Sequence, residues 1–336
     1  MINAFAPGRV NLIGDHTDHT GGLVLPMAID QGTTVAGERG GSLVELRSPI
    51  EPEPAIVAID VTDPAALTPG WARYVAGVVA ELRPSLGFVG TVTTTLPVGA
   101  GLSSSAALAV AVGMALGFEG SPRALAQLAQ RAEQRASGVP CGIMDQLASA
   151  AGVEGHALRI DCTSLSVTPI RMPDDVEVVV VDSGQRRQLA TSAYAERAAA
   201  CQAAQAALGP LRSASLTEVA GLSDTTVRRR ARHVVTENAR VDELVTALTA
   251  GDRPAMARLM AASHASLRDD FEVSTDVLDA LVERLGTTDG VIGARLTGAG
   301  FGGCVVTLVE RAAPLPDDLV LWRVRPSAGA HVEVQT

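Results

Sequence analysis

The segment PVGAGLSSS at residues 97–105 decides how this sequence folds and what it binds. A β-branched run at residues 90–96 precedes it and predicts a strand, and an apolar segment at residues 106–116 follows it and predicts a helix. Glycines let a backbone approach an anion closely, and the start of a helix presents unpaired N–H groups at the positive end of its dipole. The three serines add hydroxyl groups, one of which suits Mg²⁺. The segment therefore predicts a phosphate-binding loop, with a plain turn and serine caps as the alternative.

Strands and helices are predicted on both sides of this loop. Further strands are expected at residues 5–10, 23–28, 33–37, 43–48, 56–61, 176–181, 291–296 and 305–309. Helices are expected at residues 71–82, 122–137, 144–151, 190–207, 228–249, 254–265 and 275–285. The first half is strand-rich and the second half is helix-rich. We therefore predict an α+β fold with two lobes, residues 1–165 and residues 166–336.

Composition excludes several classes of function. All 27 basic residues of this 336-residue chain are arginines, so a Walker-type phosphate loop and a lysine Schiff base, which both need lysine, are impossible. The formal net charge is −10 and the chain has only two Trp and two Tyr, so a nucleic-acid partner is not expected. Any phosphate chemistry must use backbone amides, arginine and metal.

The chain contains no targeting or membrane-spanning pattern. No run reaches the roughly 18 apolar residues of a membrane helix, and the first residues lack the basic and apolar regions of a secretory signal. The four cysteines are scattered, which favours reduced thiols. We expect a cytoplasmic protein without a membrane partner. The Ala-rich helix at residues 190–207 could pack inside one chain or between chains, so a monomer and a weak dimer both remain open.

Charged residues crowd into a short glycine-flanked stretch near the N-terminus. Arg9, Asp15, His16 and Asp18 lie within ten residues of one another between two predicted strands. Such a density of polar groups lowers stability unless they are solvated or bind a ligand. Two carboxylates and a histidine suit a polyhydroxylated ligand, because donors and acceptors alternate around sugar hydroxyls. A solvated charged loop is the alternative.

Two further patterns suggest chemistry. Asp145, in CGIMDQ at residues 141–146, starts a predicted helix, where it either compensates the dipole or orients a hydroxyl that attacks a phosphoryl group, with Arg9 as its counter-charge. Glu133 is either a surface charge or the partner of Ser105 on Mg²⁺. A second glycine loop, residues 298–303, predicts a close backbone approach to a ligand or to the first loop, unless it is only a hairpin turn.

Together these segments resemble the GHMP kinase superfamily and, within it, the galactokinase family. The signature of that family reads approximately GRVNLIGEHTDYNGG, and residues 8–22 read GRVNLIGDHTDHTGG. The motifs at residues 97–105, 141–146 and 296–304 (LTGAGFGGC) also match, in the family's order. The resemblance covers nearly the whole chain.

The resemblance implies a two-lobed fold with the site between the lobes, and transfer of the γ-phosphoryl of ATP to the anomeric hydroxyl of galactose. It implies that Asp145 is the catalytic carboxylate with Arg9 as its partner, and that Ser105 and Glu133 hold Mg²⁺. The implied nucleotide-binding residues are Trp71, Pro97, Gly99, Ala100, Gly101, Leu102, Ser103, Ser104 and Ser105. The implied sugar-binding residues are Asp15, His16, Asp18, Gly142 and Tyr194.

Three departures leave the substrate open, one of which is that the sequence starts only a few residues before the first motif, without the longer N-terminal segment common in the family. Asp15 replaces the usual Glu at the position expected to meet the 6-hydroxyl, and His19-Thr20 replaces Tyr-Asn. The alternatives are another sugar or cyclitol, such as C6-modified galactose, N-acetylgalactosamine or arabinose. A non-catalytic sugar and ATP sensor would be expected to have lost the phosphate motif or the Asp145 and Arg9 pair, which are intact. Homoserine and mevalonate kinases share the serine-rich loop but lack the signature at residues 9–22.

Overall fold

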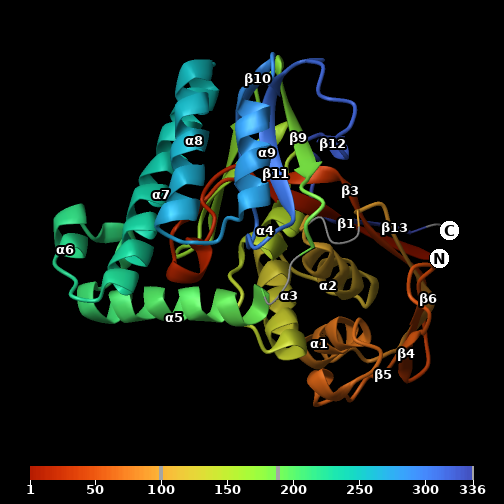
Figure 1. The fold of residues 1–336 in the computed structure, drawn as a ribbon. Helices are drawn as coiled ribbons and strands as arrows, with labels where there is room; N and C mark the ends of the chain where they lie inside the picture. Colours follow the sequence, from red (N-terminus) through yellow and green to blue (C-terminus); the bar gives the residue numbers. More distant parts are fainter. Residues whose placement is uncertain (98–100, 187–189, 335–336) are drawn as a thin grey trace.

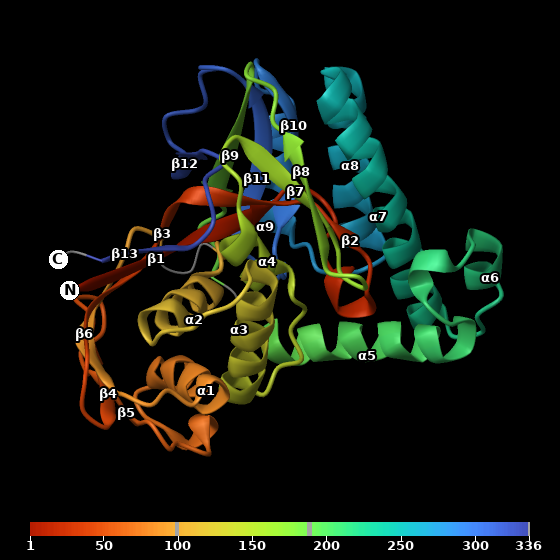
Figure 2. The ribbon, with the colours of Figure 1, turned by 180° about the vertical axis from the view of Figure 1, so that it is seen from behind.

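The largest sheet has six strands and positions the N-terminal motifs. The computed structural model describes residues 1–97, 101–186 and 190–334 (Figures 1 and 2). In spatial order the strands are β13 (His331–Val334), β1 (Ile2–Asn11), β3 (Pro26–Arg39), β6 (Phe88–Thr94), β4 (Leu43–Arg47) and β5 (Ala55–Ala58). Among the strands of the described residues, only β4 and β6 pair in parallel. Because β13 pairs with β1, the first and last strands of the chain lie side by side (Figure 1).

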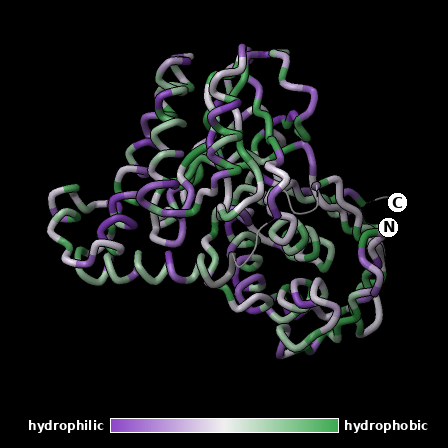
Figure 3. Tube along the Cα trace, in the orientation of Figure 1, coloured by the Kyte–Doolittle hydropathy of each residue, from purple (hydrophilic) through white to green (hydrophobic). Residues whose placement is uncertain are grey.

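Helices cover one face of this sheet. They are α1 (Ala72–Leu82), α2 (Ser104–Ala115), α3 (Pro122–Ser137) and α4 (Met144–Ala151). Helix α2 packs on β1 and β3, and α1, α3 and α4 contact its other sides. Because it is surrounded in this way, it is apolar around most of its circumference. Hydrophobic stretches run through the centre of the molecule in Figure 3.

The rest of the described chain contains two smaller sheets and the helices that pack near them. One sheet has the order β10 (Val291–Thr297), β11 (Cys304–Glu310), β9 (Val176–Asp182) and β12 (Leu321–Val324), and the other has β2 (Leu23–Val24), β7 (His156–Asp161) and β8 (Ser166–Arg171). Helices α8 (Arg253–Asp269) and α9 (Asp276–Gly286) pack on β10, and α7 (Thr225–Ala250) packs on α8. Helix α5 (Ala190–Leu208) lies against α7, and the short helices are α6 (Leu216–Ala220), η1 (Asp18–Thr20), η2 (Pro64–Ala66) and η3 (Leu211–Ser213).

The predicted α+β class is confirmed, and several helices end where their caps require. Helix α3 starts after Ser121, whose hydroxyl accepts from the Ala124 N–H at 3.2 Å, and Pro122 occupies its first turn. It ends at Gly138, which adopts the left-handed conformation with φ 71°. These local signals account for the agreement with residues 122–137.

One strand prediction was wrong. The segments at residues 23–28 and 33–37 were expected to be two strands, but β3 runs unbroken over 14 residues from Pro26 to Arg39. Gly32 lies inside this strand. A Cβ at this position would lie 2.4 Å from the Ala6 carbonyl and 2.5 Å from the Phe5 ring. The glycine is therefore a point of close strand approach.

The chain crosses between the two predicted lobes more than once. The expected boundary at residues 165 and 166 falls in the turn between β7 and β8, which pair with each other. Strand β13 then returns to β1. The division into lobes stays a prediction. Within the described residues, no helix is both long and apolar enough to span a membrane.

Candidate active site

Three neighbouring cavities share lining residues: Arg9, Glu133, Asp145 and Ala299 border the first and second, and Ser104 and Ser105 border the second and third. The carboxylate chamber has a volume of about 350 Å³, the serine chamber about 490 Å³ and the tryptophan chamber about 240 Å³. The carboxylate chamber is lined by Arg9, Asp15, His16, Asp18, Tyr74, Glu133, Ser137, Val139, Cys141, Gly142, Met144, Asp145, Gln146, Tyr194, Gly298 and Ala299. The serine chamber is lined by Arg9, Leu96, Pro97, Gly101, Leu102, Ser103, Ser104, Ser105, Glu133, Asp145, Arg186 and Ala299. The tryptophan chamber is lined by Thr33, Ser48, Ile50, Glu51, Trp71, Tyr74, Val92, Thr94, Ser104, Ser105 and Leu108.

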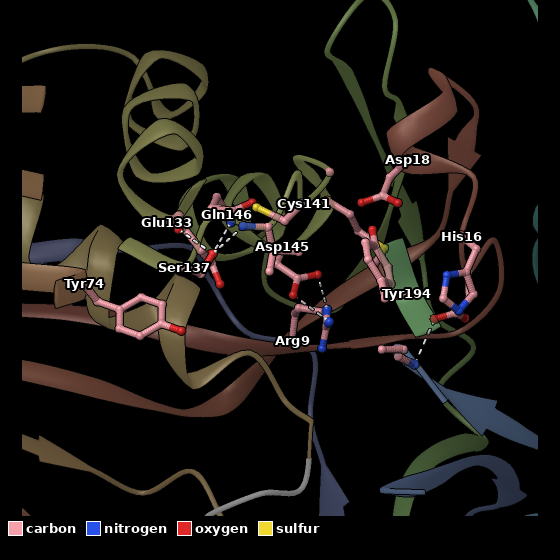
Figure 4. A pocket seen from close by; sticks show the side chains of 16 residues that line it. Arg9, His16, Asp18, Tyr74, Glu133, Ser137, Cys141, Asp145, Gln146 and Tyr194 are labelled. Atoms are coloured by element: carbon pink, nitrogen blue, oxygen red, sulfur yellow. Dashed lines mark hydrogen bonds and ion pairs between the residues drawn. The ribbon is translucent and has the colours of Figure 1, made fainter. Parts of the chain in front are cut away.

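Arg9 and Asp145 form the wall shared by the first two chambers. Figure 4 shows them near the middle of the carboxylate chamber, with Glu133 and Tyr74 to one side and His16, Asp18 and Tyr194 to the other. The Arg9 Nε and Nη2 atoms donate to Asp145 Oδ1 and Oδ2, both at 2.7 Å. Its Nη1 donates to the Gly101 carbonyl at 2.8 Å. One buried guanidinium therefore fixes the carboxylate and the glycine loop relative to each other.

The first glycine loop lies against β1. The Arg9 N–H donates to the Leu102 carbonyl at 3.1 Å. A Cβ on Gly8 would lie 2.6 Å from that same carbonyl, so glycine is needed for this approach. Ser103 is the N-cap of α2 in the left-handed conformation with φ 62°, and its hydroxyl donates to Asp145 Oδ2. The mouth of α2 and the Asp145 carboxylate thus open onto one cavity.

Glu133 borders both the serine chamber and the carboxylate chamber. The Ser105 hydroxyl donates to Glu133 Oε1 at 2.7 Å, and Gln146 Nε2 donates to Oε2 at 2.7 Å. Burial raises the pKa of Glu133, while the bond from Ser105 opposes this shift and the charge of Asp145 adds to it. No described residue forms an ion pair with Glu133. A cation beside Glu133 and Ser105 would therefore compensate a buried carboxylate.

Within residues 1–97, 101–186 and 190–334, no group of three or more His, Cys, Asp or Glu side chains is arranged to bind a metal. A hydroxyl and a carboxylate at the edge of a phosphate-sized cavity do suit Mg²⁺, which commonly takes one or two protein ligands and fills its octahedron with phosphate oxygens and water.

Asp15 is almost completely buried behind the carboxylate chamber. Its Oδ2 accepts from Asn11 Nδ2 at 2.8 Å and from the Arg295 guanidinium, and its Oδ1 accepts from the Gly298 N–H at 2.9 Å. Burial raises the pKa of Asp15, and the charge of Arg295 opposes this shift. Both oxygens are therefore engaged by the protein. Gly298 belongs to the second glycine loop, so its bond to Asp15 Oδ1 is a point at which that loop contacts residues 14–22.

The remaining sugar-site candidates converge on one side of the chamber. The His16 ring stacks on Phe271 with centroids 4.5 Å apart and lies 5.8 Å from the Tyr194 ring. Burial lowers the pKa of His16 well below its ordinary value, so its ring is neutral at neutral pH. A Cβ on Gly142 would lie only 1.8 Å from Asp18 Oδ2, so the carboxylate rests directly on the glycine backbone.

Family models match three parts of the chain. The galactokinase galactose-binding signature matches residues 2–39, the GHMP kinase N-terminal domain matches residues 73–153, and the GHMP kinase C-terminal domain matches residues 244–316. A galactokinase of Bos taurus is 46% identical over 92% of this chain and 83% of its own length. A galactokinase of Roseiflexus sp. (strain RS-1) is 44% identical over the same shares of the two chains.

The chain belongs to the galactokinase family.

Solved structures agree with this membership. Lactococcus lactis galactokinase complexed with galactose superposes with a TM-score of 0.89 at 32% identity, over 98% of this chain and 95% of that chain. Methanococcus jannaschii mevalonate kinase has a TM-score of 0.70 at 19% identity, over 97% of this chain and 98% of that one, which shows a shared fold alone. The resemblance to GHMP kinases and the α+β fold are therefore confirmed. The galactokinase-family chain is a phosphotransferase.

The structure brings together most of the predicted site residues of this galactokinase-family chain. Gly99 and Ala100 lie outside the described residues. The Leu102 side chain is buried in the core, and its carbonyl accepts from the Arg9 N–H. The Trp71 ring borders the tryptophan chamber and donates through Nε1 to the Glu53 carbonyl at 3.0 Å. The catalytic and binding roles of individual residues stay predictions.

Some site residues were missed from the sequence. Arg186, in the segment after β9, borders the serine chamber, and Ala299 borders both that chamber and the carboxylate chamber. Arg295 pairs with Asp15 across 280 residues. An arginine in a loop carries no local signal of phosphate contact. The glycines around Ala299 were the only sequence sign that this loop approaches the site.

Proposed function

We propose that this chain transfers the γ-phosphoryl group of ATP to the anomeric (C1) hydroxyl of galactose, with Mg²⁺ as the cation. The observation that carries the proposal is the meeting of Ser103 and Asp145 at one cavity wall, 42 residues apart in sequence. It joins an anion-binding helix start to a carboxylate that faces a second, sugar-sized chamber.

Phosphoryl transfer depends mainly on positioning and charge stabilisation. Asp145 Oδ2 accepts from both Arg9 and Ser103, whereas among the described residues Oδ1 accepts only from Arg9. Oδ1 therefore keeps a lone pair for the proton of the attacking hydroxyl. Because both oxygens are fixed, Asp145 holds the hydroxyl in line with the phosphoryl group and takes its proton as the bond to phosphorus forms. The bond between the γ-phosphorus and the bridging oxygen breaks, and ADP leaves.

The nucleotide fits the other two chambers. The tryptophan chamber accepts the nucleoside, and the serine chamber accepts the phosphate chain against the backbone of the α2 mouth. Arg186 borders the phosphate end and supplies a positive charge to a chain that has no lysine. Ser105 and Glu133 would hold Mg²⁺, which neutralises phosphate charge when bound.

The sugar occupies the carboxylate chamber. Asp18, His16 and Tyr194 present one carboxylate, one neutral imidazole and one phenol, which together suit the donors and acceptors of ring hydroxyls. Gly142 leaves room for Asp18 at the chamber wall. Asp15 bonds to Asn11, Arg295 and Gly298, so it shapes the end of the chamber and has less capacity left for a sugar hydroxyl.

An ADP-release assay with a panel of about a dozen monosaccharides and cyclitols tests the function. Galactose-dependent ADP release, with galactose giving the highest kcat/KM, is the expected result. Higher kcat/KM for a C6-modified galactose, N-acetylgalactosamine or arabinose would reassign the substrate and keep the kinase. Sugar binding without ADP release from any member of the panel would overturn catalysis and favour a sensor.

A further inference from the structure

The loop that carries the proposed sugar-binding residues is supported by a helix from the far half of the chain. Residues 14–22 contain Asp15, His16 and Asp18. Helix α7 contacts β2 at the end of this loop, and Figures 1 and 2 both place α7 beside the red segment that contains η1. Three side chains of α7, from His233, Glu237 and Asn238, reach the backbone of the loop or of Leu23 directly after it.

Glu237 supports the start of the loop. Its side chain has no exposed surface, and its Oε1 accepts from the Gly14 N–H at 3.0 Å and from the Ser263 hydroxyl at 2.6 Å. Its Oε2 accepts from Arg240 Nε at 2.7 Å. Burial alone would raise the pKa of Glu237, but Arg240 and His233 outweigh it and hold the pKa near 2. Glu237 is therefore a buried carboxylate ion, and both of its oxygens accept hydrogen bonds from other residues.

The other two contacts hold Asp15, the second residue of the loop, and Leu23, which follows the loop directly. His233 Nε2 lies 3.0 Å from the Asp15 carbonyl, so this nitrogen carries the proton and donates it. Asn238 Oδ1 accepts from the Leu23 N–H at 2.6 Å, and its Nδ2 donates to the Val234 carbonyl at 2.7 Å. The residue pairs are 223, 218 and 215 positions apart in sequence.

The phosphate-binding side has separate supports. Arg9 on β1 fixes the glycine loop and Asp145, while Glu133 on α3 holds Ser105. No described residue of α7 borders the serine or tryptophan chamber. A change in α7 therefore reaches the sugar side of the site without a direct route to the nucleotide side.

We propose that Glu237 is a positioning residue that sets the affinity for the sugar, by holding Gly14 so that Asp15, His16 and Asp18 keep their places, and that Asn238 does the same at Leu23. This inference rests on the proposed function only in taking residues 15–18 as sugar ligands. According to this inference, contacts from α7 influence the affinity for the sugar, whereas other elements determine the affinity for the nucleotide.

Glu237→Gln tests the inference. Glutamine has one acceptor oxygen, so it either loses the Gly14 and Ser263 bonds or points its NH₂ group at Arg240. We expect the KM for galactose to rise about 10-fold, while the KM for ATP changes by less than about 2-fold and saturating galactose restores most of the rate. Calorimetry should show the same loss in galactose binding.

Glu243→Gln is the matched control. Glu243 lies on the same helix, is about half exposed and faces Arg258 at 3.9 Å, so both KM values should stay at wild-type levels. Equal changes in the two KM values for Glu237→Gln, or no change in either, would overturn the positioning role. If Glu237→Gln does not fold, Asn238→Ala decides, with an expected rise of about 3- to 10-fold in the galactose KM alone.

The wild-type measurements separate this inference from the proposed function. Galactose binding without ADP release in the wild type would end the kinase proposal, but calorimetry of Glu237→Gln would still test the positioning role. Normal turnover in the wild type with unchanged galactose affinity in both variants would end the positioning role and leave the kinase intact.

Discussion

Arg9 holds Asp145 through two parallel hydrogen bonds, Nε to Oδ1 and Nη2 to Oδ2, each 2.7 Å long. The pair joins β1 to the first turn of α4 across 136 residues. A planar guanidinium fixes the orientation of a carboxylate in a way that a single point charge cannot. Asp145 is therefore held at the boundary between the serine and carboxylate chambers, where an acceptor hydroxyl and a phosphate chain would meet.

Replacing Asp145 by asparagine should abolish most of the turnover. The amide keeps the shape of the side chain but removes the charge and turns one acceptor into a donor that faces Arg9. We expect kcat to fall by about 10³-fold, with the affinity for ATP within a few-fold of wild type, measured by ADP release and by calorimetry. Asp242→Asn, which alters an exposed pair with Arg159, should leave both values unchanged. Wild-type turnover in Asp145→Asn would exclude Asp145 from catalysis.

Glu133→Gln should raise the metal requirement. Losing the carboxylate charge beside Ser105 weakens cation binding at the phosphate chain, so the Mg²⁺ concentration for half-maximal turnover should rise about 10- to 100-fold. The galactose KM should change little, because Glu133 lies on the opposite side of Asp145 from His16 and Asp18 (Figure 4). The exposed Glu119→Gln is the control. An unchanged Mg²⁺ titration would remove Glu133 from the metal site.

Gly142→Ala should block the sugar and spare the nucleotide. The new Cβ would lie 1.8 Å from Asp18 Oδ2, so Asp18 must move out of its place. We expect the KM for galactose to rise roughly 10- to 100-fold and ATP affinity to stay near wild type. Gly286→Ala, at a glycine with open space around it, should behave as wild type. Unchanged galactose binding in Gly142→Ala would show that Asp18 does not hold the sugar.

Unfolding free energy should decrease as the pH falls from 6.5 towards 4. Burial lowers the pKa of His233 to about 4, against 6.5 for an ordinary histidine, although Glu237 opposes the shift. The unfolded chain therefore binds a proton that the folded chain excludes, and the contribution of neutral His233 is complete above pH 6.5 and is lost as pH falls through 4. His233→Gln should reduce the slope of unfolding free energy against pH by up to about 1.4 kcal/mol per unit.

Denaturant unfolding of the wild type and His233→Gln at several pH values between 7 and 4 checks this slope. Burial also lowers the pKa of His16. Part of the slope therefore comes from His16 and should be the same in the two proteins. Equal slopes in the two proteins would mean that His233 already accepts its proton in the folded state.

Local patterns were enough where the chemistry is local. Ser121, Pro122 and Gly138 mark the ends of α3, and the predicted and observed ranges agree. Strand β13 was missed because every one of its residues is exposed and its sequence shows no buried face. It is a strand only because it pairs with β1, at the other end of the chain.

The sequence by itself determined the fold class and the family, and it predicted a phosphate loop, because glycine placement, helix caps and motif order are properties of neighbouring residues. Only the tertiary structure decided the following pairings of distant residues. Asp145 shares a cavity wall with Ser103. The Asp15 oxygens accept from Arg295 and Gly298, and Glu237 accepts from Gly14. These pairs are separated by 42 to 283 residues, and no local pattern records which distant side chain will satisfy a buried polar group. The packing of helices and sheets makes that choice, because each buried donor or acceptor needs a partner inside the fold.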